Sequence, residues 1–187
     1  AREAHGQVVV VVSAMSGVTD ALLDAARAAA RGDEDAWTRT LQALREKHME
    51  VLHRLVPEGP LQEGTAARLQ GLLAQAGGWF EEVQAAAKLD PQMLDLVGSL
   101  GERLSAPLLA AVLRSKGCPA EAVEATEVIV TDDNFRSANP FMAETEARAR
   151  ERLLPLVREG VVPVVTGFIG ATPDGRVTTL GRGGSDY

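Results

Sequence analysis

The stretch Val8-Val-Val-Val-Val-Ser-Ala-Met-Ser-Gly-Val-Thr-Asp20 decides the fold that we expect of this 187-residue chain. Its run of consecutive valines is typical of a β-strand that is buried on both faces. The segment from Ser13 to Asp20 forms a loop of mostly small residues, and a helix-forming stretch follows at residues 21–31. A strand, a loop and a helix in this order aim the first N–H groups of the helix at an anion.

The second half of the chain alternates strands and helices. Helices are expected at residues 99–116, opened by Ser99-Leu-Gly-Glu102, and at about residues 140–159; strands are expected at residues 121–125, 127–131, 161–166 and 176–180. Thr172-Pro-Asp-Gly175 has the composition of a turn that joins two antiparallel strands. The alternation predicts an α/β fold with a largely parallel sheet and helices on both faces.

Residues 32–90 have a different character. Apolar residues recur there at helical spacing in two segments, which Pro57-Glu-Gly-Pro60 separates. Asp33 or Asp35 can cap the first helix, and Gly77-Gly78 weakens the middle of the second. We interpret residues 33–89 as a helical hairpin inserted into the α/β domain.

Composition excludes several classes of partner. The net charge of −7 disfavours nucleic acid, whose binding depends on clustered Lys and Arg. No uninterrupted apolar run approaches the roughly 20 residues of a membrane span, and no secretory leader opens the chain. The single Cys118 excludes an internal disulfide and favours a reducing, cytoplasmic location.

The most informative short segment is Thr178-Thr-Leu-Gly-Arg-Gly-Gly-Ser-Asp-Tyr187. Closely spaced glycines let backbone N–H groups converge on a phosphate or a carboxylate. Arg182 and Asp186 add one cation and one carboxylate within four positions of each other.

This segment, the Ser13–Asp20 loop and Gly101-Glu102 stand in the order seen in aspartate kinases. The chain resembles that family over essentially its whole length, and it looks closest to the subgroup that carries a long helical insertion. The resemblance implies the amino-acid-kinase fold, an αβα sandwich. It also implies phosphorylation of the side-chain carboxylate of L-aspartate by ATP with Mg²⁺, the first step toward lysine, methionine and threonine. The intact enzyme is then expected to be a homo-oligomer.

The resemblance also implies roles for particular residues. Arg182 and Asp186 are the expected catalytic residues, and Gly183 and Gly184 are expected on the phosphate side of ATP. The residues expected to bind aspartate are Ser13, Thr19, Glu102, Arg182 and Ser185. The Lys-Phe-Gly-Gly strand of the family, which supplies a phosphate-binding lysine, has no counterpart here, and most of the nucleotide site is also missing. We therefore expect residues 1–187 to be a partial catalytic domain that does not turn over alone.

These residue types suit the chemistry. A substrate carboxylate, with an ordinary pKa of about 3.9, is already ionised at neutral pH and needs no general base. The difficulty is the repulsion between that carboxylate and a polyphosphate, so catalysis reduces to positioning and charge neutralisation. Arg182 can hold a carboxylate through two charge-assisted hydrogen bonds, and Glu102 can hold the substrate ammonium. Asp186 would orient a lysine and, through water, the metal.

Structural interpretations remain open for several of these residues. Ser99 and Glu102 have the spacing of a capping box, and Thr19 can simply cap its helix. Asp132-Asp133 fits a turn better than a metal site. His48 and His53 lie on different helix faces and are expected at a surface or interface.

Two other functions also stay open. One keeps the fold and changes the substrate to glutamate, acetylglutamate or a nucleoside monophosphate. The other is a non-catalytic ligand-binding or scaffold module, because none of the three lysines, Lys47, Lys88 and Lys116, belongs to a strand-end loop.

Overall fold

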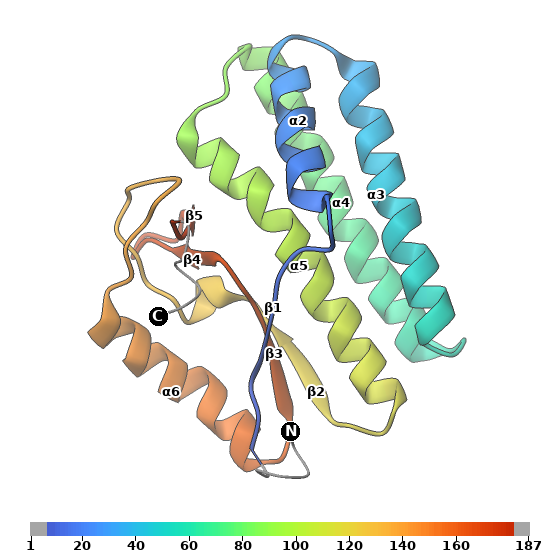
Figure 1. The fold of residues 1–187 in the computed structure, drawn as a ribbon, viewed down its shortest axis with the longest axis vertical. Helices are drawn as coiled ribbons and strands as arrows, with labels where there is room; N and C mark the ends of the chain where they lie inside the picture. Colours follow the sequence, from blue (N-terminus) through green and yellow to red (C-terminus); the bar gives the residue numbers. More distant parts are fainter. Residues whose placement is uncertain (1–6, 182–187) are drawn as a thin grey trace.

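The computed structural model describes residues 7–181, and a three-stranded parallel sheet lies at its centre (Figure 1). The strands are β1 (Val10–Val12), β2 (Ala120–Val123) and β3 (Val162–Thr166), in the order β1-β3-β2. Every residue of the central strand β3 is buried. The register pairs Val10 with Val164 and Ala122 with the same valine, so both outer strands run parallel to β3.

Helices cover both faces of this sheet, as the sequence predicts. Helix α5 (Pro91–Ser115) packs on one face, where Ala106 and Ala110 meet Val162 and Val164. Helix α6 (Met142–Arg158) lies on the other side (Figure 1), and its Leu153 and Leu156 pack against the cluster around Val165. The small alanine side chains bring α5 close to the sheet.

The strand at residues 8–12 differs from the prediction of burial on both faces. Val10 and Val12 pack under α5, whereas Val9 is 43% exposed and Val11 is 63% exposed. Helix α6 covers β3 but leaves this side of β1 open, so in the described residues the valine run is buried on one face only.

The two helices predicted within residues 33–89 are present. They are α3 (Glu34–Leu55) and α4 (Pro60–Ala86), and they form a helical cluster with α2 (Val18–Ala30) and α5 (Figure 1). Asp33 caps α3 by accepting a hydrogen bond from the Ala36 N–H at 3.0 Å. Trp37 packs against Phe80 with ring centroids 5.7 Å apart. Helix α4 runs without interruption through Gly77-Gly78.

One prediction within α3 is wrong. His48 is fully buried rather than at a surface, because it lies on the face of α3 that packs into the helical cluster. Its Nδ1 atom is 2.6 Å from the Leu44 carbonyl oxygen, while the neighbouring His53 is exposed.

Helix α5 begins eight residues earlier than predicted. It starts at Pro91, and Asp90 caps it by accepting a hydrogen bond from the Met93 N–H at 2.9 Å. Ser99 and Glu102 therefore lie in the helix interior, and the capping-box interpretation is wrong. The Ser99 hydroxyl donates to the Leu96 carbonyl instead, at 2.7 Å.

The same helix is long and apolar. An 18-residue window of α5 has a mean hydropathy of 1.4, which by length and composition would fit a membrane span. However, 72% of that window is buried inside the fold. The central helix of a packed domain has the same properties.

A second, two-stranded sheet completes the fold. Strands β4 (Ile169–Ala171) and β5 (Val177–Thr179) are antiparallel and are joined by the predicted turn, in which the Gly175 N–H donates to the Thr172 carbonyl at 2.8 Å. The predicted strand at residues 127–131 is absent. A 3₁₀ turn, η1 (Ala125–Glu127), occupies its start because Glu124 and Glu127 form a capping box, and only single bridges follow at Val130 and Thr131.

Candidate active site

The candidate site begins where the carboxyl ends of β1 and β3 lie close together. The Gly167 N–H donates to the Val12 carbonyl at 2.7 Å. A Cβ at Gly167 would lie only 3.1 Å from that carbonyl oxygen, so glycine permits the close approach. Ser13 follows directly after β1 and is exposed at this edge of the sheet.

Glu102 reaches the same loop from α5. Helix and loop touch at Gly101, where a Cβ would lie 2.6 Å from the Ala14 Cβ. The next residue, Glu102, is 4% exposed, and its Oε1 atom accepts a hydrogen bond from the Ala14 N–H at 3.3 Å. Its Oε2 atom is buried and has no hydrogen-bond partner among residues 7–181. Burial raises the pKa of Glu102, because the charged form loses solvation.

A buried carboxylate oxygen without a donor is costly, so the Glu102 geometry calls for a ligand. An unsatisfied buried acceptor typically costs about 1–3 kcal/mol, and more if it is charged. A cationic donor such as an ammonium would satisfy the free oxygen and neutralise the charge. The free oxygen of Glu102 beside the Ser13–Gly17 loop is therefore chemically suited to a cation.

The start of helix α2 lies at the end of this loop. Gly17 is its N-cap residue, with φ +77°, and no side chain caps the helix. Thr19 is half-buried and is the second residue of the helix, so the interpretation of Thr19 as N-cap is wrong. An uncapped helix start presents free N–H groups and a partial positive charge, which suit an anion.

Lys47 brings a cation to the loop from the helical segment. Its Nζ atom donates to the Ser16 carbonyl at 2.7 Å, although the two residues are 31 positions apart. The sequence places Lys47 on a helix and outside any strand-end loop, yet α3 packs against α2 and carries this side chain to the loop. No local pattern in the sequence indicates this contact.

A second carboxylate on α5, that of Asp95, anchors the end of β5. It lies on α5 two helical turns before Glu102 and is fully buried. Its carboxylate accepts hydrogen bonds from the Thr179 N–H at 3.0 Å, from the Thr179 hydroxyl at 2.5 Å and from the Arg136 N–H at 2.9 Å. Unlike Glu102, Asp95 is fully satisfied by the protein, so it fixes the end of β5.

The chain then passes the carboxyl end of β3. The Leu180 N–H donates to the Phe168 carbonyl at 2.9 Å. Phe168 itself has φ +64°, a left-handed conformation that costs free energy for a residue other than glycine. Gly181 thus lies close to the β3 end. The sequence analysis did not find Phe168 or Asp95, although the spacing of Asp95 and Glu102 places both on one helix face.

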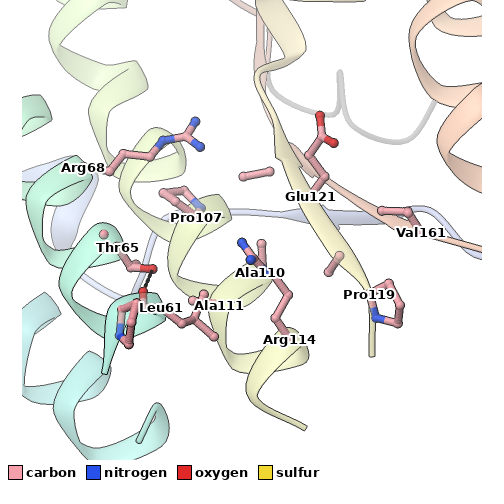
Figure 2. Close-up of a pocket in the computed structure, with 14 residues that line it drawn as sticks. Leu61, Thr65, Arg68, Pro107, Ala110, Ala111, Arg114, Pro119, Glu121 and Val161 are labelled. Carbon is pink, nitrogen blue, oxygen red and sulfur yellow. Dashed lines mark hydrogen bonds between the residues drawn. The ribbon is translucent and has the colours of Figure 1, made fainter. Parts of the chain in front are cut away.

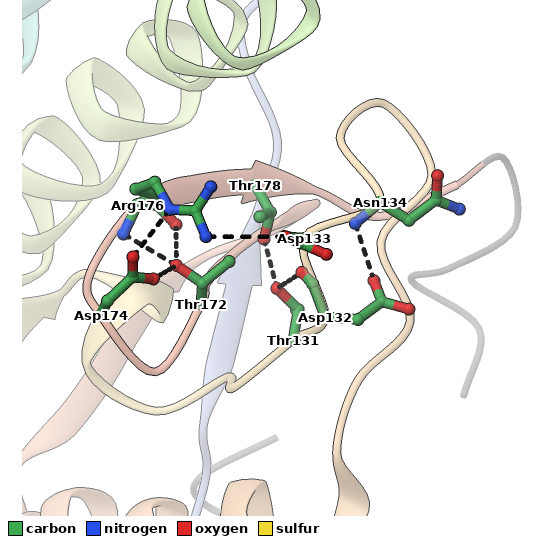
Figure 3. A network of polar contacts seen from close by, with 8 residues as sticks. All are labelled: Thr131, Asp132, Asp133, Asn134, Thr172, Asp174, Arg176 and Thr178. Atoms are coloured by element: carbon green, nitrogen blue, oxygen red, sulfur yellow. Dashed lines mark hydrogen bonds and ion pairs between the residues drawn. The ribbon is translucent and has the colours of Figure 1, made fainter.

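The Asp132-Asp133 loop is a structural turn (Figure 3). Asp132 accepts hydrogen bonds from the Asn134 N–H at 3.2 Å and from the side-chain amide of Asn139 at 2.8 Å. These hydrogen bonds, led by that from the Asn139 side chain, lower the pKa of Asp132. Asp133 pairs with Arg176 at 3.7 Å. Within residues 7–181, no three metal-ligating side chains cluster, so the turn interpretation is favoured.

The remaining predicted site residues lie outside the described residues. They are Arg182, Gly183, Gly184, Ser185 and Asp186. Of the predicted residues that the structure describes, Ser13, Thr19 and Glu102 belong to elements that converge at the loop after β1.

A comparison with protein families decides the family of this chain. A family model described as "Amino acid kinase family" matches residues 1–187. The chain belongs to the amino acid kinase family. Its mixed α/β fold, with a mostly parallel sheet, matches that of solved members of the family.

The relatives of this chain include several aspartokinases. The chain is 34% identical over 178 residues to lysine-sensitive aspartokinase 3 of Escherichia coli, covering 95% of this chain and 37% of the relative. It is 33% identical to an aspartokinase of Chlamydia muridarum over 178 residues, covering 95% of this chain and 36% of that relative. The chain thus spans little more than a third of the length of these curated relatives.

A solved structure gives the same picture. Aspartokinase III of E. coli, crystallised with aspartate and ADP, superposes with a TM-score of 0.83 at 32% identity, covering 97% of this chain and 38% of that one. Aspartate kinase of Clostridium acetobutylicum superposes with a TM-score of 0.66 at 21% identity, covering 96% of this chain and 36% of that one, and supports the fold alone.

Proposed function

We propose that this chain is the aspartate-binding part of an aspartate kinase, which transfers the γ-phosphoryl group of ATP to the side-chain carboxylate of L-aspartate. The single observation that carries the proposal is the Oε2 atom of Glu102 beside the loop after β1, which is buried and lacks a partner within the described residues 7–181. The similarity to aspartokinases, one of them crystallised with aspartate and ADP, supports this choice of substrate and nucleotide.

The roles of the described residues follow from their surroundings. Glu102 accepts the substrate ammonium, which supplies the donor that Oε2 lacks. The uncapped start of α2, with Ser13 and Thr19, receives carboxylate or phosphate oxygens. Lys47 holds the loop through Ser16, so the insertion helix supports the position of these N–H groups.

The reaction itself needs no proton transfer. An ionised oxygen of the aspartate side chain forms a bond to the γ-phosphorus, and the bond from that phosphorus to the β,γ-bridging oxygen breaks, so ADP leaves with the electron pair. When bound, Mg²⁺ would reduce the negative charge of the phosphate groups, and Asp186 would help to hold it through water. The proposed residues nearest to this step are Arg182, Gly183, Gly184, Ser185 and Asp186, all carried over from the resemblance. We place the enzyme in the cytoplasm, in the synthesis of lysine, methionine and threonine, as a homo-oligomer.

The structure gives less support to the alternative function, a non-catalytic ligand-binding or scaffold module. It rested on the lack of a cation near the strand-end loop, whereas Lys47 reaches that loop in the folded chain. The buried carboxylate of Glu102, with one oxygen free within residues 7–181, favours a chain that binds a ligand over a pure scaffold, but it does not separate a kinase from a non-catalytic ligand-binding module.

The test is an assay of the intact protein that contains this chain. Aspartate-dependent release of ADP from ATP is expected, and its absence with correctly folded protein would refute the proposal. Arg182→Lys should chiefly raise the KM for aspartate, because lysine cannot form the paired hydrogen bonds of a guanidinium. Asp186→Ala should instead lower kcat by orders of magnitude. If neither parameter changes, these two residues lie outside the site.

A further inference from the structure

A cavity in the described part of the chain lies away from the candidate active site. It has a volume of about 790 Å³ and opens between α4, α5 and β2 (Figure 2). Its lining includes Pro119 and Ala120 at the start of β2 and Val161 just before β3. It therefore faces the amino ends of the strands, whereas Ser13 and Gly167 lie at their carboxyl ends.

Two exposed arginines, one from each of two neighbouring helices, line this cleft and give it a positive charge. Arg68 from α4 and Arg114 from α5 both reach toward the hollow (Figure 2). Neither has an ion pair or a side-chain hydrogen bond within residues 7–181. The carboxylate in the lining, Glu121, is engaged by Arg152 at 2.6 Å and does not neutralise them. Two unpaired cations facing one hollow are notable in a chain of net charge −7.

The floor between the two arginines is apolar. Leu61 and Pro107 contribute to it together with the small side chains Ala110 and Ala111. A cavity of this size and composition is typical of sites for small organic molecules. A guanidinium group binds carboxylate and phosphate through paired hydrogen bonds.

We propose that this cleft is a second ligand site, separate from the catalytic one, for an organic dianion. The ligand carries two carboxylate or phosphate groups, one for Arg68 and one for Arg114, joined by a short apolar part that lies on Ala110 and Ala111. Because the walls belong to α4 and to α5, the bound dianion ties the helical hairpin to the helix that carries Glu102. The site does not depend on the proposed kinase activity.

Binding is measured by titration calorimetry on the intact protein with aspartate at saturation, so that the catalytic site is filled. The probes are heptanedioate and fructose 1,6-bisphosphate, which each carry two anionic groups and are called dianions for that reason, and heptanoate, which matches heptanedioate but carries one anionic group. At least one dianion should bind more than about tenfold tighter than heptanoate, since each charge-assisted hydrogen bond is worth roughly tenfold or more in affinity. The better of the two dianions tells whether carboxylate or phosphate is preferred.

Variants decide whether the cleft is responsible. Arg68→Gln and Arg114→Gln should each weaken dianion binding about tenfold or more. Arg54→Gln removes the same charge from an exposed position outside the cleft and should leave binding unchanged. The proposal is overturned if neither dianion binds below about 10 mM, a negligible affinity, or if the cleft variants bind as well as Arg54→Gln does. A crystal of the intact protein with another segment seated on Arg68 and Arg114 would also overturn it.

Discussion

Glu102 and His48 are both buried ionisable side chains, and each has one polar atom without a partner in the described part of the chain. The surroundings of the two atoms differ. His48 stays neutral, since burial lowers its pKa, and its Nδ1–H donates to the Leu44 carbonyl. Only a lone pair on Nε2 remains unused in the helical cluster. Glu102 instead faces the loop after β1, where a ligand can reach its free oxygen.

The Glu102→Gln variant tests this difference. Because burial raises the pKa of Glu102, its contribution to stability is present below the unfolded pKa of about 4.5 and is lost as the pH rises through the folded value. At pH 7 the variant should therefore be more stable than the wild-type protein, by about 1–3 kcal/mol, because a neutral amide costs less to bury than a charged carboxylate. The gain should vanish toward pH 4, and aspartate binding should weaken by about tenfold or more.

Thermal unfolding across pH measures the first effect, and titration with aspartate measures the second. A Glu102→Gln protein that is less stable at pH 7 would mean that the carboxylate has a purely structural role. Unchanged aspartate affinity would remove Glu102 from the substrate site.

His48 predicts a pH dependence of the opposite sign. Its folded pKa is lower than the unfolded value of 6.5, mainly because burial removes solvation, so the unfolded chain binds the proton more readily. The stability that neutral His48 contributes is full above pH 6.5 and is lost as the pH falls toward the folded pKa. The loss reaches at most about 1.4 kcal/mol per pH unit.

Urea unfolding of the His48→Gln variant between pH 7 and pH 5 measures this term. As the pH falls, the free energy of unfolding should decrease less in the variant than in the wild-type protein. The exposed His53 on the same helix provides the control, because His53→Gln should keep the wild-type slope. Equal slopes in all three proteins would contradict the assignment.

At the scale of elements, the contact between α5 and the loop depends on one missing side chain. Glycine within a helix is normally unfavourable by about 1 kcal/mol relative to alanine. At Gly101 the sign should reverse, because an added Cβ would lie 2.6 Å from the Ala14 Cβ, at a position where both backbones are held. Gly101→Ala should lower the free energy of unfolding by about 1–3 kcal/mol, because the added methyl group overpacks this contact. It should also break the hydrogen bond from the Ala14 N–H to Glu102.

Gly98→Ala on the same helix is the matched control for this prediction. A Cβ there would meet only the Leu23 side chain, at an ordinary 3.9 Å. It should stabilise the protein by up to about 1 kcal/mol. Thermal unfolding compares the two variants, and a stabilising Gly101→Ala would show that the loop can move away without cost.

Local sequence patterns predicted the elements better than the contacts between them. Valine runs and Thr172-Pro-Asp-Gly175 identified strands and a turn correctly, because period and turn chemistry are local properties. The start of α5 was missed since Ser99 and Glu102 imitate a capping box, while the true cap is Asp90. The links from Lys47 to Ser16 and from Asp95 to Thr179 join residues 31 and 84 positions apart, and no local pattern encodes them.

At the scale of the whole molecule, helix α6 covers β3 on one face of the sheet, but the described chain leaves β1 exposed on that face. Val9 and Val11 are exposed, and an apolar groove of about 420 Å³ runs from Val9 to Leu153 and Val157 on α6. At the other edge, Pro119 precedes β2 and Glu121 is exposed, two features that discourage strand pairing. Since the relatives are about two and a half times as long, we expect the intact protein to bury the β1 side with another part of its chain.

This asymmetry predicts how the 187-residue chain behaves by itself. An exposed apolar strand next to an apolar groove favours self-association, because pairing removes that surface from water. Val11→Lys should therefore shift the chain toward monomer in light-scattering measurements at matched concentration. Leu55→Lys changes the charge equally at an apolar residue of 39% exposure on a helix end, away from the sheet, and should leave association as it is. If both variants reduce self-association equally, net charge rather than the β1 face controls it. If neither variant reduces it, the β1 face does not drive self-association.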